Sequence, residues 1–202
     1  MLIGDFLKNI KKEFRNHHFA GLSFSSNDCK KDYIFFAIKG TKLDGSKFID
    51  HAIKKGATII ISEQKFEGIK NNILFLRSKE VRKLLSEIAY KIKKNKPKNL
   101  VAVTGTNGKS SIADFYFQLL SLSNRKVASI GTLGNKTKNN LKKFSNTTLD
   151  PIVLSKILSE LKKQKIDNVI LEASSHGLKQ NRLDGLKFNT AIFTNLSHDH
   201  LD

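Results

Sequence analysis

The segment Thr104-Gly105-Thr106-Asn107-Gly108-Lys109-Ser110-Ser111 constrains the fold of this chain more than any other feature. It follows a short apolar run, residues 100–103, and precedes a stretch with helical spacing, residues 112–122. A strand, a glycine-rich turn and a helix in that order form a phosphate cradle, because backbone N–H groups approach an anion and the helix N-terminus adds its positive dipole end. The segment therefore predicts a nucleotide-phosphate site at the end of a strand.

Two side chains in this segment have the chemistry of nucleotide cleavage. We expect Lys109 to reach the terminal phosphates and the hydroxyl of Ser110 to bind magnesium. The loop is shorter than the common G-x-x-x-x-G-K-[ST] pattern, since Val103 stands where that pattern has its first glycine. An ordinary Gly-Asn turn before a helix is the alternative, but the coincidence of strand, turn, Lys-Ser pair and helix favours the cradle.

Length and composition narrow the class of protein. A chain of 202 residues can bury a real core and has room for one or two domains. No stretch approaches the roughly 18 apolar residues of a membrane span, so we expect no membrane insertion, and residues 1–14 do not read as a signal peptide. The single cysteine, Cys29, excludes an internal disulfide and fits a cytoplasmic protein.

The formal net charge of +18 raises the possibility of nucleic-acid binding. The lysines, however, are spread over nearly every segment and form no arginine-rich stripe. Dispersed lysine is typical of a solvated surface, which also favours anionic substrates. We therefore expect no nucleic-acid partner.

The pattern of apolar residues predicts two α/β domains: residues 1–95, a linker at 96–99, and residues 100–202. In the first domain we expect helices over 3–14, 46–55 and 79–94, with Ser78 as the N-cap of the last, and strands over 57–62 and 73–76. In the second, strands at 100–104, 126–130, 169–172 and 190–194 alternate with helices at 109–122 and 151–164. Such alternation predicts a mostly parallel sheet with ligands at the carboxyl ends of its strands.

Three polar clusters fall at those strand ends: the phosphate loop, residues 172–176 and residues 195–200. Glu172 ends an apolar strand and is placed like the acidic residue that holds magnesium in nucleotide-cleaving enzymes, although a carboxylate satisfied by a helix cap is the alternative. His198, Asp199 and His200 could bind a metal or act as acid and base. Ser174 and Ser175 lack a nucleophile elbow, so a serine nucleophile is not expected.

These segments resemble the Mur ligases. The resemblance is carried by residues 104–111, by Glu172-Ala173-Ser174-Ser175-His176-Gly177-Leu178 and by residues 194–202, with Asn146-Thr147-Thr148-Leu149-Asp150-Pro151 similar to a substrate-binding threonine pair. It points to the member that adds the third amino acid to UDP-N-acetylmuramoyl-L-alanyl-D-glutamate. In the first domain Ser25-Ser26-Asn27 departs from the Asp-Ser-Arg that family members more often carry.

The resemblance implies an ATP- and magnesium-dependent ligase of peptidoglycan biosynthesis. Its substrates would be the UDP-N-acetylmuramoyl-dipeptide and a diamino acid, meso-diaminopimelate in the first place and L-lysine as the alternative, joined through an acyl phosphate. ATP would be bound by Gly105, Thr106, Asn107, Gly108, Lys109, Ser110 and Ser111, and magnesium by Ser110, Glu172 and His200. The UDP end would contact Phe24, Ser26, Thr41, Lys42 and Leu43, and the muramoyl-peptide would contact Asn146, Thr147, Thr148, Ser174, Gln180 and Arg182. Lys109, Glu172 and His200 would be the catalytic residues.

Family members continue beyond the position that corresponds to Asp202, with a further magnesium ligand and the amino-acid pocket. The resemblance therefore predicts a truncated or partial product that is inactive by itself. Two other functions stay open at this stage: another ligase of the same superfamily, acting on folate or cyanophycin, and a nucleotide-binding module without turnover. The Thr147-Thr148 and Ser174-Ser175-His176 segments argue against a folate or cyanophycin ligase.

Overall fold

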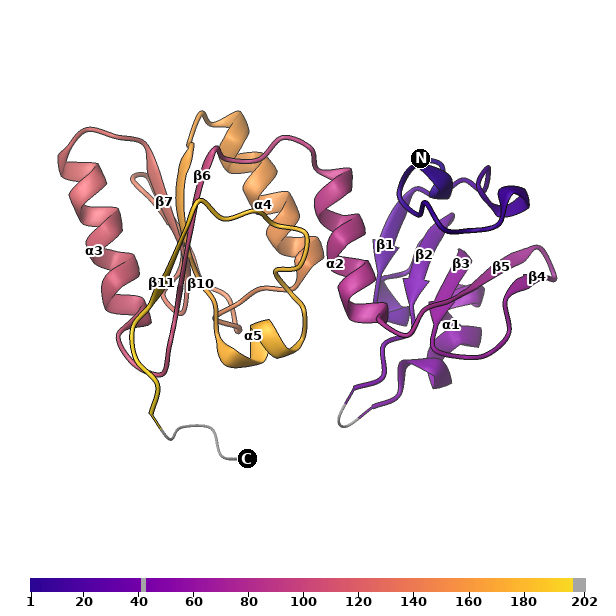
Figure 1. Cartoon of the computed structure of the whole chain (residues 1–202). Coiled ribbons are helices and arrows are strands. Elements are labelled where there is room, and N and C mark those ends of the chain that lie inside the picture. The colour runs from indigo at the N-terminus through magenta and orange to yellow at the C-terminus, as the bar shows by residue number, and fades with distance from the viewer. Residues whose placement is uncertain (41–42, 198–202) are drawn as a thin grey trace. The chain divides into compact units, whose positions relative to one another are not determined.

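The computed structural model describes residues 1–40 and 43–197 of the chain (Figure 1). The chain divides into two compact units, Met1–Lys91 and Ile92–Asp202. Each unit is built on its own mostly parallel sheet with helices packed against it, so the expected α/β class is confirmed. In the described part of the chain, no helix is long and apolar enough to cross a membrane.

The N-terminal unit holds a five-stranded sheet in the order β1-β2-β3-β5-β4. Four of its strands are parallel, and β4 runs antiparallel to β5 at one edge. The strands are β1 (Gly21–Ser23), β2 (Tyr33–Phe36), β3 (Ala57–Ser62), β4 (Gly68–Lys70) and β5 (Ile73–Arg77). The expected strands at 57–62 and 73–76 are thus confirmed.

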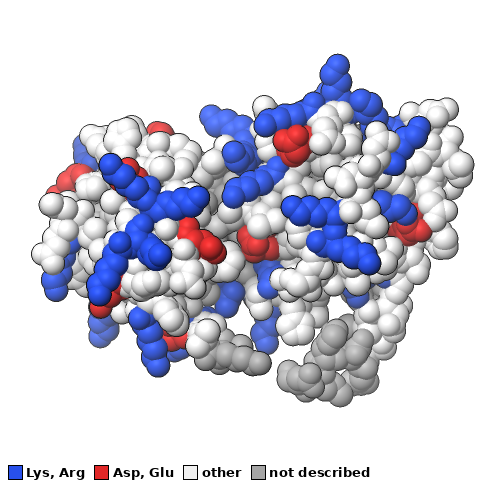
Figure 2. Space-filling model, turned by 180° about the vertical axis from the view of Figure 1, so that it is seen from behind, with Lys and Arg blue, Asp and Glu red and all other residues white. Residues whose placement is uncertain are grey.

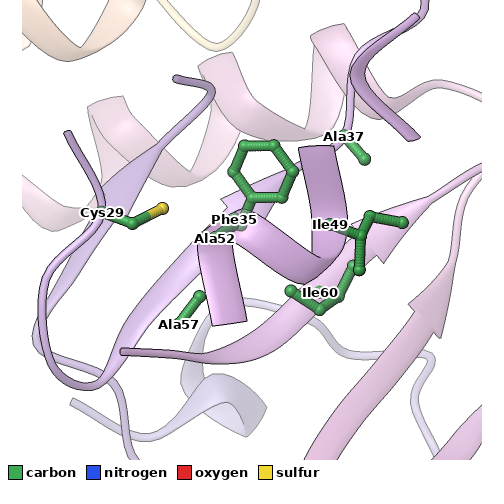
Figure 3. Close-up of a cluster of buried hydrophobic side chains, with 7 residues drawn as sticks. All are labelled: Cys29, Phe35, Ala37, Ile49, Ala52, Ala57 and Ile60. Atoms are coloured by element: carbon green, nitrogen blue, oxygen red, sulfur yellow. The ribbon is translucent and has the colours of Figure 1, made fainter. Parts of the chain in front are cut away.

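The core of this unit lies on both faces of the sheet. On one face α1 (Ile49–Lys54) packs Ile49 and Ala52 against Phe35 and Ile60, as Figure 3 shows. Successive residues of a strand point to opposite faces, so Ile59 faces the other side, where it is also fully buried. A sheet covered on both faces explains the nearly continuous apolar runs of β2 and β3.

The other helices of this unit differ in part from expectation. The 46–55 helix divides into the 3-10 turn η4 (Gly45–Phe48) and α1, and α2 (Val81–Ile92) is shorter than the expected 79–94. The expected N-cap, Ser78, is wrong by two residues: its Oγ accepts from Glu80 N at 3.1 Å, but the helix starts at Val81 and Glu80 takes the cap position.

The expected helix over residues 3–14 is wrong. Residues 3–14 instead contain two 3-10 turns, η1 (Ile3–Asp5) and η2 (Lys12–Phe14). The chain doubles back on itself there, because Ile3 N donates to His17 O and Gly4 N donates to Arg15 O, each at 3.0 Å. The apolar spacing reflects burial of Ile3 and Phe14 within this loop rather than one face of a helix.

The second unit holds a six-stranded sheet in the order β11-β6-β10-β7-β8-β9. Its parallel strands are β6 (Asn99–Thr104), β7 (Val127–Gly131), β10 (Asn168–Glu172) and β11 (Thr190–Phe193), all close to expectation. An antiparallel hairpin, β8 (Gly134–Thr137) and β9 (Asn140–Lys142), extends the sheet beyond β7 and was not expected from the sequence.

Helices α3 (Lys109–Leu122) and α4 (Pro151–Lys163) cover opposite faces of this sheet (Figure 1). Helix α3 buries Ala113 against Val103 and Ile170. Helix α4 begins as its sequence predicts, because Asp150 caps Val153 N at 3.0 Å and Pro151 occupies the first turn. A short additional helix, α5 (Ser175–Lys179), follows β10.

Candidate active site

The carboxyl ends of the parallel strands meet at one edge of the second sheet. In the register of the strands, Glu172 pairs with Val103, Leu171 with Ile130, and Phe193 with Thr104. The segments that follow β6, β7, β10 and β11 therefore start side by side. This is the edge at which the sequence predicts ligand binding.

The glycine-rich loop after β6 is held by the segment that follows β11. Thr106 N donates to Asn195 O at 3.1 Å, and Asn107 N donates to Asn195 Oδ1 at 3.0 Å. Thr194 Oγ1 donates to Asn107 O at 2.7 Å. Two segments about 90 residues apart in sequence thus fix the loop in one conformation.

Glycine at position 105 is required by both backbone conformation and space. Gly105 has φ +129°, and a Cβ there would lie 2.0 Å from Thr194 Oγ1. Lys109 folds back over the same loop, where its ammonium donates to Gly105 O at 2.6 Å and Thr106 O at 2.8 Å. The loop is therefore closed by a cation, which leaves a positive charge at the start of α3.

The N-terminus of α3 has no side-chain cap. Its N-cap is Gly108, with φ +83°, whereas Asp150 caps α4 and Ser174 caps Gly177 N of α5 at 3.1 Å. The first N–H groups of a helix have no partner within the helix. At α3 these groups and the helix dipole are left for an anion from outside the helix.

Glu172 is the buried carboxylate of the site, with only 3% of its surface exposed. Its Oε2 accepts hydrogen bonds from Ser110 Oγ and from Thr132 Oγ1, each at 3.0 Å, and its Oε1 accepts one from Thr132 N at 3.1 Å. Within residues 1–40 and 43–197 it forms no salt bridge. A buried carboxylate with hydrogen bonds but no cation is suited to receive one.

The donor set at Glu172 fits a hard cation that prefers oxygen ligands, such as Mg²⁺. Carboxylate and hydroxyl oxygens of Glu172 and Ser110 lie next to the phosphate loop. The described residues contain no group of three or more His, Cys, Asp or Glu side chains that could hold a metal alone. Another expected ligand, His200, lies outside the described residues, together with His198 and Asp199.

The expected substrate threonine Thr148 contacts the backbone of Glu172, whereas Ser110 contacts its side chain. Thr148 Oγ1 donates to Glu172 O at 2.9 Å and accepts from Ser174 N at 2.9 Å. Arg182 Nη1 donates to Thr148 O, and Arg182 Nη2 donates to Gln180 Oε1 at 2.8 Å. The structure thus brings together Thr148, Ser174, Gln180 and Arg182, and Asn146 is an exposed residue ahead of Thr147.

The candidate uridine contacts belong to the N-terminal unit. Phe24 and Leu43 are exposed, with 43% and 68% of their surfaces accessible. Ser26 is buried instead, and its Oγ lies 3.0 Å from His51 Nδ1. Thr41 and Lys42 lie outside the described residues. Next to Leu43, a hydrogen bond from Ser46 N lowers the pKa of the Asp44 carboxyl.

Comparison with known families identifies the family of this chain. Residues 103–202 match the model of the Mur ligase middle domain, and residues 18–93 match that of the Mur ligase family, catalytic domain. The two matches together cover most of each unit and all described residues of the site. The chain belongs to the Mur ligase family.

Several Mur ligases share much of this sequence. The UDP-N-acetylmuramoyl-L-alanyl-D-glutamate--2,6-diaminopimelate ligase of Rickettsia conorii is 41% identical over 198 residues, which are 96% of this chain and 41% of that protein. The ligase of the same name from Buchnera aphidicola subsp. Schizaphis graminum is 41% identical over 192 residues, 91% of this chain and 39% of that protein. The chain thus spans about two fifths of the length of these curated relatives.

Solved Mur ligase structures share the fold. A UDP-N-acetylmuramoyl-L-alanyl-D-glutamate--2,6-diaminopimelate ligase matches with a TM-score of 0.85 and 32% identity, over 100% of this chain and 42% of that chain. The MurF ligase from Thermotoga maritima in complex with ADP matches with a TM-score of 0.54 and 21% identity, over 86% of this chain and 37% of that chain. The second likeness supports the fold alone.

The sequence does not point to one residue of this candidate site and understates the role of two others. Thr132 contacts Glu172 through both its backbone and its side chain, yet it lies in a turn with no motif of its own. Thr194 is predicted only as the end of a strand and Asn195 only as the start of a polar cluster, and in the structure both residues hold the glycine-rich loop. The sequence offers only one local signal for Thr132, its place just after a predicted strand, and the pairing of that strand with β10 is seen only in the structure.

A cavity of about 810 Å³ lies away from this site, at the opposite end of the second sheet. It lies between the C-terminal ends of α3 and α4 and the β8–β9 hairpin. Its cations are already engaged in part, since Lys126 Nζ donates to Gln164 O and Lys142 lies 5.5 Å from the Phe144 ring centre.

On the face shown in Figure 2, Lys and Arg side chains are spread between Asp and Glu side chains.

Proposed function

We propose that the protein is an ATP-dependent ligase that joins UDP-N-acetylmuramoyl-L-alanyl-D-glutamate to a diamino acid. The observation that carries the proposal is Glu172, a buried carboxylate that contacts Ser110 of the phosphate loop through its side chain and Thr148 through its backbone. A carboxylate between a phosphate site and a substrate site suits phosphoryl transfer, which depends on positioning and charge neutralisation. The names of the Rickettsia and Buchnera relatives favour diaminopimelate over L-lysine as the diamino acid.

In this proposal the loop residues Gly105 to Ser111 bind ATP. The uncapped N-terminus of α3 offers backbone N–H groups to the phosphates, and Lys109 adds a positive charge from within the loop. Ser110, Glu172 and His200 would hold Mg²⁺, which neutralises charge on the transferred phosphoryl group when it is bound. Lys109, Glu172 and His200 act by position and charge, and no protein nucleophile is needed.

The remaining polar residues would orient the second substrate. Arg182 presents a guanidinium group, which suits a carboxylate or phosphate, beside the Thr147-Thr148 pair. Asn146, Ser174 and Gln180 would complete the muramoyl-peptide contacts. The N-terminal domain, residues 1–95, would bind the uridine end through Phe24, Ser26, Thr41, Lys42 and Leu43. A linker at 96–99 would join it to the ATP-binding domain, residues 100–202.

ATP, a UDP-linked precursor and a free buried thiol at Cys29 fit a reaction in the cytoplasm. Burial raises the pKa of the Cys29 thiol, which keeps it in the unreactive thiol form at neutral pH. We expect neither a nucleic-acid partner nor a metal-thiolate role for this residue.

Calorimetry with the purified 202-residue chain tests the proposal. We expect ATP with Mg²⁺ to bind, and UDP-N-acetylmuramoyl-dipeptide to bind where folate does not. Absence of binding by both ATP and the UDP-dipeptide would contradict the proposal, and folate binding would favour the folate-ligase alternative. A turnover assay with ATP, Mg²⁺, the UDP-dipeptide and either diamino acid, read by mass spectrometry, then distinguishes the ligase from a nucleotide-binding module.

A further inference from the structure

We infer that Thr132 is a positioning residue of this site, which holds the Glu172 carboxylate in the orientation that a nucleotide-bound cation needs. The inference rests on the proposed function and adds a residue to it. Thr132 lies in the turn after β7, the strand that pairs with β10, which carries Glu172. Its side chain is exposed, so it contributes little to the core.

Thr132 holds both oxygens of the carboxylate. Its backbone N–H donates to Oε1 at 3.1 Å, and its hydroxyl donates to Oε2 at 3.0 Å. Two donors from one residue fix the plane of the carboxylate, whereas a single hydrogen bond would leave it free to rotate. The preceding residue, Gly131, leaves open the space that the Glu172 carboxylate occupies, because a Cβ at position 131 would lie 2.2 Å from Oε1.

Thr132 and Ser110 both donate to Glu172, but they have different roles at the carboxylate. An ionised carboxylate can only accept, so Ser110 and Thr132 both donate their single hydroxyl protons to Oε2. Since Thr132 holds both oxygens, the carboxylate keeps its orientation when Ser110 changes partner. Ser110 is therefore the hydroxyl that is free to serve as a ligand.

The hydrogen bonds of Thr132 also reach the expected substrate threonines. Thr132 Oγ1 lies 3.0 Å from Thr147 Oγ1, and either oxygen could donate by geometry alone. The proton of Thr132 is already given to Glu172, so Thr147 must be the donor. Thr132 thus joins the threonine pair to the carboxylate through a continuous, directed chain of hydrogen bonds.

The test measures the affinity for ATP by calorimetry, once in excess Mg²⁺ and once in EDTA. The affinity in Mg²⁺ divided by the affinity in EDTA is called the magnesium gain. Thr132→Val keeps the shape and the backbone N–H but removes the hydroxyl, and we expect it to lower the gain roughly ten-fold, the order for one hydrogen bond to a charged group. Affinity in EDTA should not change. Thr132→Ser should retain most of the gain, and Thr137→Val, a matched change in β8, should retain all of it.

The same substitution made in a Glu172→Gln variant shows whether Thr132 acts through the carboxylate. If Thr132 acts through the carboxylate, Thr132→Val should lower the gain no further in Glu172→Gln, because coupled residues are not additive. An unchanged gain in Thr132→Val, or a full further loss in Glu172→Gln, would overturn the inference while leaving the proposed function intact. A wild-type chain without any magnesium gain would contradict the proposed function and the inference together. Equal thermal unfolding temperatures of wild type and variants verify that the comparison is between folded proteins.

Discussion

Gly131 and Glu172 are so close that no side chain fits between them. A Cβ on Gly131 would lie 2.2 Å from Glu172 Oε1 and 2.4 Å from its Cδ. The neighbouring strands β7 and β10 bring the two residues together, and the missing side chain at 131 makes the space into which the carboxylate folds. The position of a candidate metal ligand is thus set by a glycine 41 positions earlier in the chain.

Gly131→Ala should therefore displace Glu172. We expect a loss of about 1–3 kcal/mol in the free energy of unfolding, the range for overpacked sites, together with loss of magnesium-dependent ATP binding. Urea unfolding and calorimetry measure the two effects. Leu133→Ala, a change at an exposed position two residues on, is the control and should alter neither. Normal magnesium dependence in Gly131→Ala would show that the carboxylate does not need this space.

Lys109→Ala should weaken ATP binding by about 1.5–3 kcal/mol, since a charge-assisted contact to phosphate is lost. The structure adds a second effect, because the ammonium also donates to Gly105 O and Thr106 O and closes the loop. Isothermal titration of wild type and variant with ATP and Mg²⁺ measures the change. Lys138→Ala, on the exposed β8–β9 turn, controls for loss of one positive charge. Equal affinities of wild type and Lys109→Ala would sink the assignment of this loop to ATP.

Thr148→Val should destabilise the second unit by about 1–3 kcal/mol, because it leaves two backbone groups without their partner. Thr148 is buried and bonds both Glu172 O and Ser174 N through one hydroxyl. Thr148→Ser keeps that hydroxyl and should recover most of the stability. Chemical unfolding followed by circular dichroism measures both variants, and similar losses in Val and Ser would point to the methyl group instead.

Asp114 should make the stability of the second unit depend on pH. A hydrogen bond from Lys136, 2.6 Å away, and one from Gln118 hold the pKa of the Asp114 carboxyl below its usual value. A lowered pKa in the folded state stabilises the protein above the unfolded pKa, about 3.9, and this contribution is lost as pH falls through the folded pKa.

We therefore expect Asp114→Asn to cost roughly 0.2–1 kcal/mol at pH 7, the range for a partly exposed pair, and to cost less as pH falls below about 4. Urea unfolding at a series of pH values measures the difference. Glu160→Gln breaks a more exposed pair with Lys163 and should change little at any pH. A cost that stays constant down to pH 3 would exclude the ionised carboxylate as its source.

Trypsin should cut the chain first after Lys93 or Lys94. These residues are exposed and lie between the end of α2 and the start of β6. The linker itself, residues 96–99, is held in place, because Pro97 is buried and Lys98 N donates to Asp167 Oδ1 at 3.0 Å. Mass spectrometry of early fragments tests this, and a stable product that spans residues 90–100 would count against separable domains.

The sequence predicted the second sheet well because its signals are local. Apolar strand runs, Asp150-Pro151 before α4 and the glycine-rich loop before α3 each act within a few residues. It failed over residues 3–14, where Ile3 and Phe14 mimic helical spacing but the backbone pairs instead with residues 15–17. Helical periodicity cannot distinguish these cases, because a folded-back loop can also bury Ile3 and Phe14.

The candidate site shows the same limit. Lys109, Ser110 and Glu172 could be identified from their chemistry next to strand ends. Thr132 could not, since its role depends on which strand neighbours β10, and strand order is a long-range property that one sequence does not reveal. Asn195 was noticed for its place in a polar cluster, but its bonds to the loop from β6 became visible only with the sheet assembled.

The missing cap of α3 has a thermodynamic consequence. A helix that begins at Gly108 without a side-chain acceptor is less stable than one with an Asp or Ser cap by roughly a few tenths of a kcal/mol. An anion bound there supplies the missing cap. Binding of the anion and ordering of the first helical turn are therefore thermodynamically coupled. At a free ligand concentration a hundred times the Kd, binding would raise the free energy of unfolding by about 2.7 kcal/mol. Amide hydrogens of Lys109 and Ser110 should then exchange with solvent slowly when ATP is present and rapidly when it is absent, which makes this helix end a direct reporter of ligand occupancy.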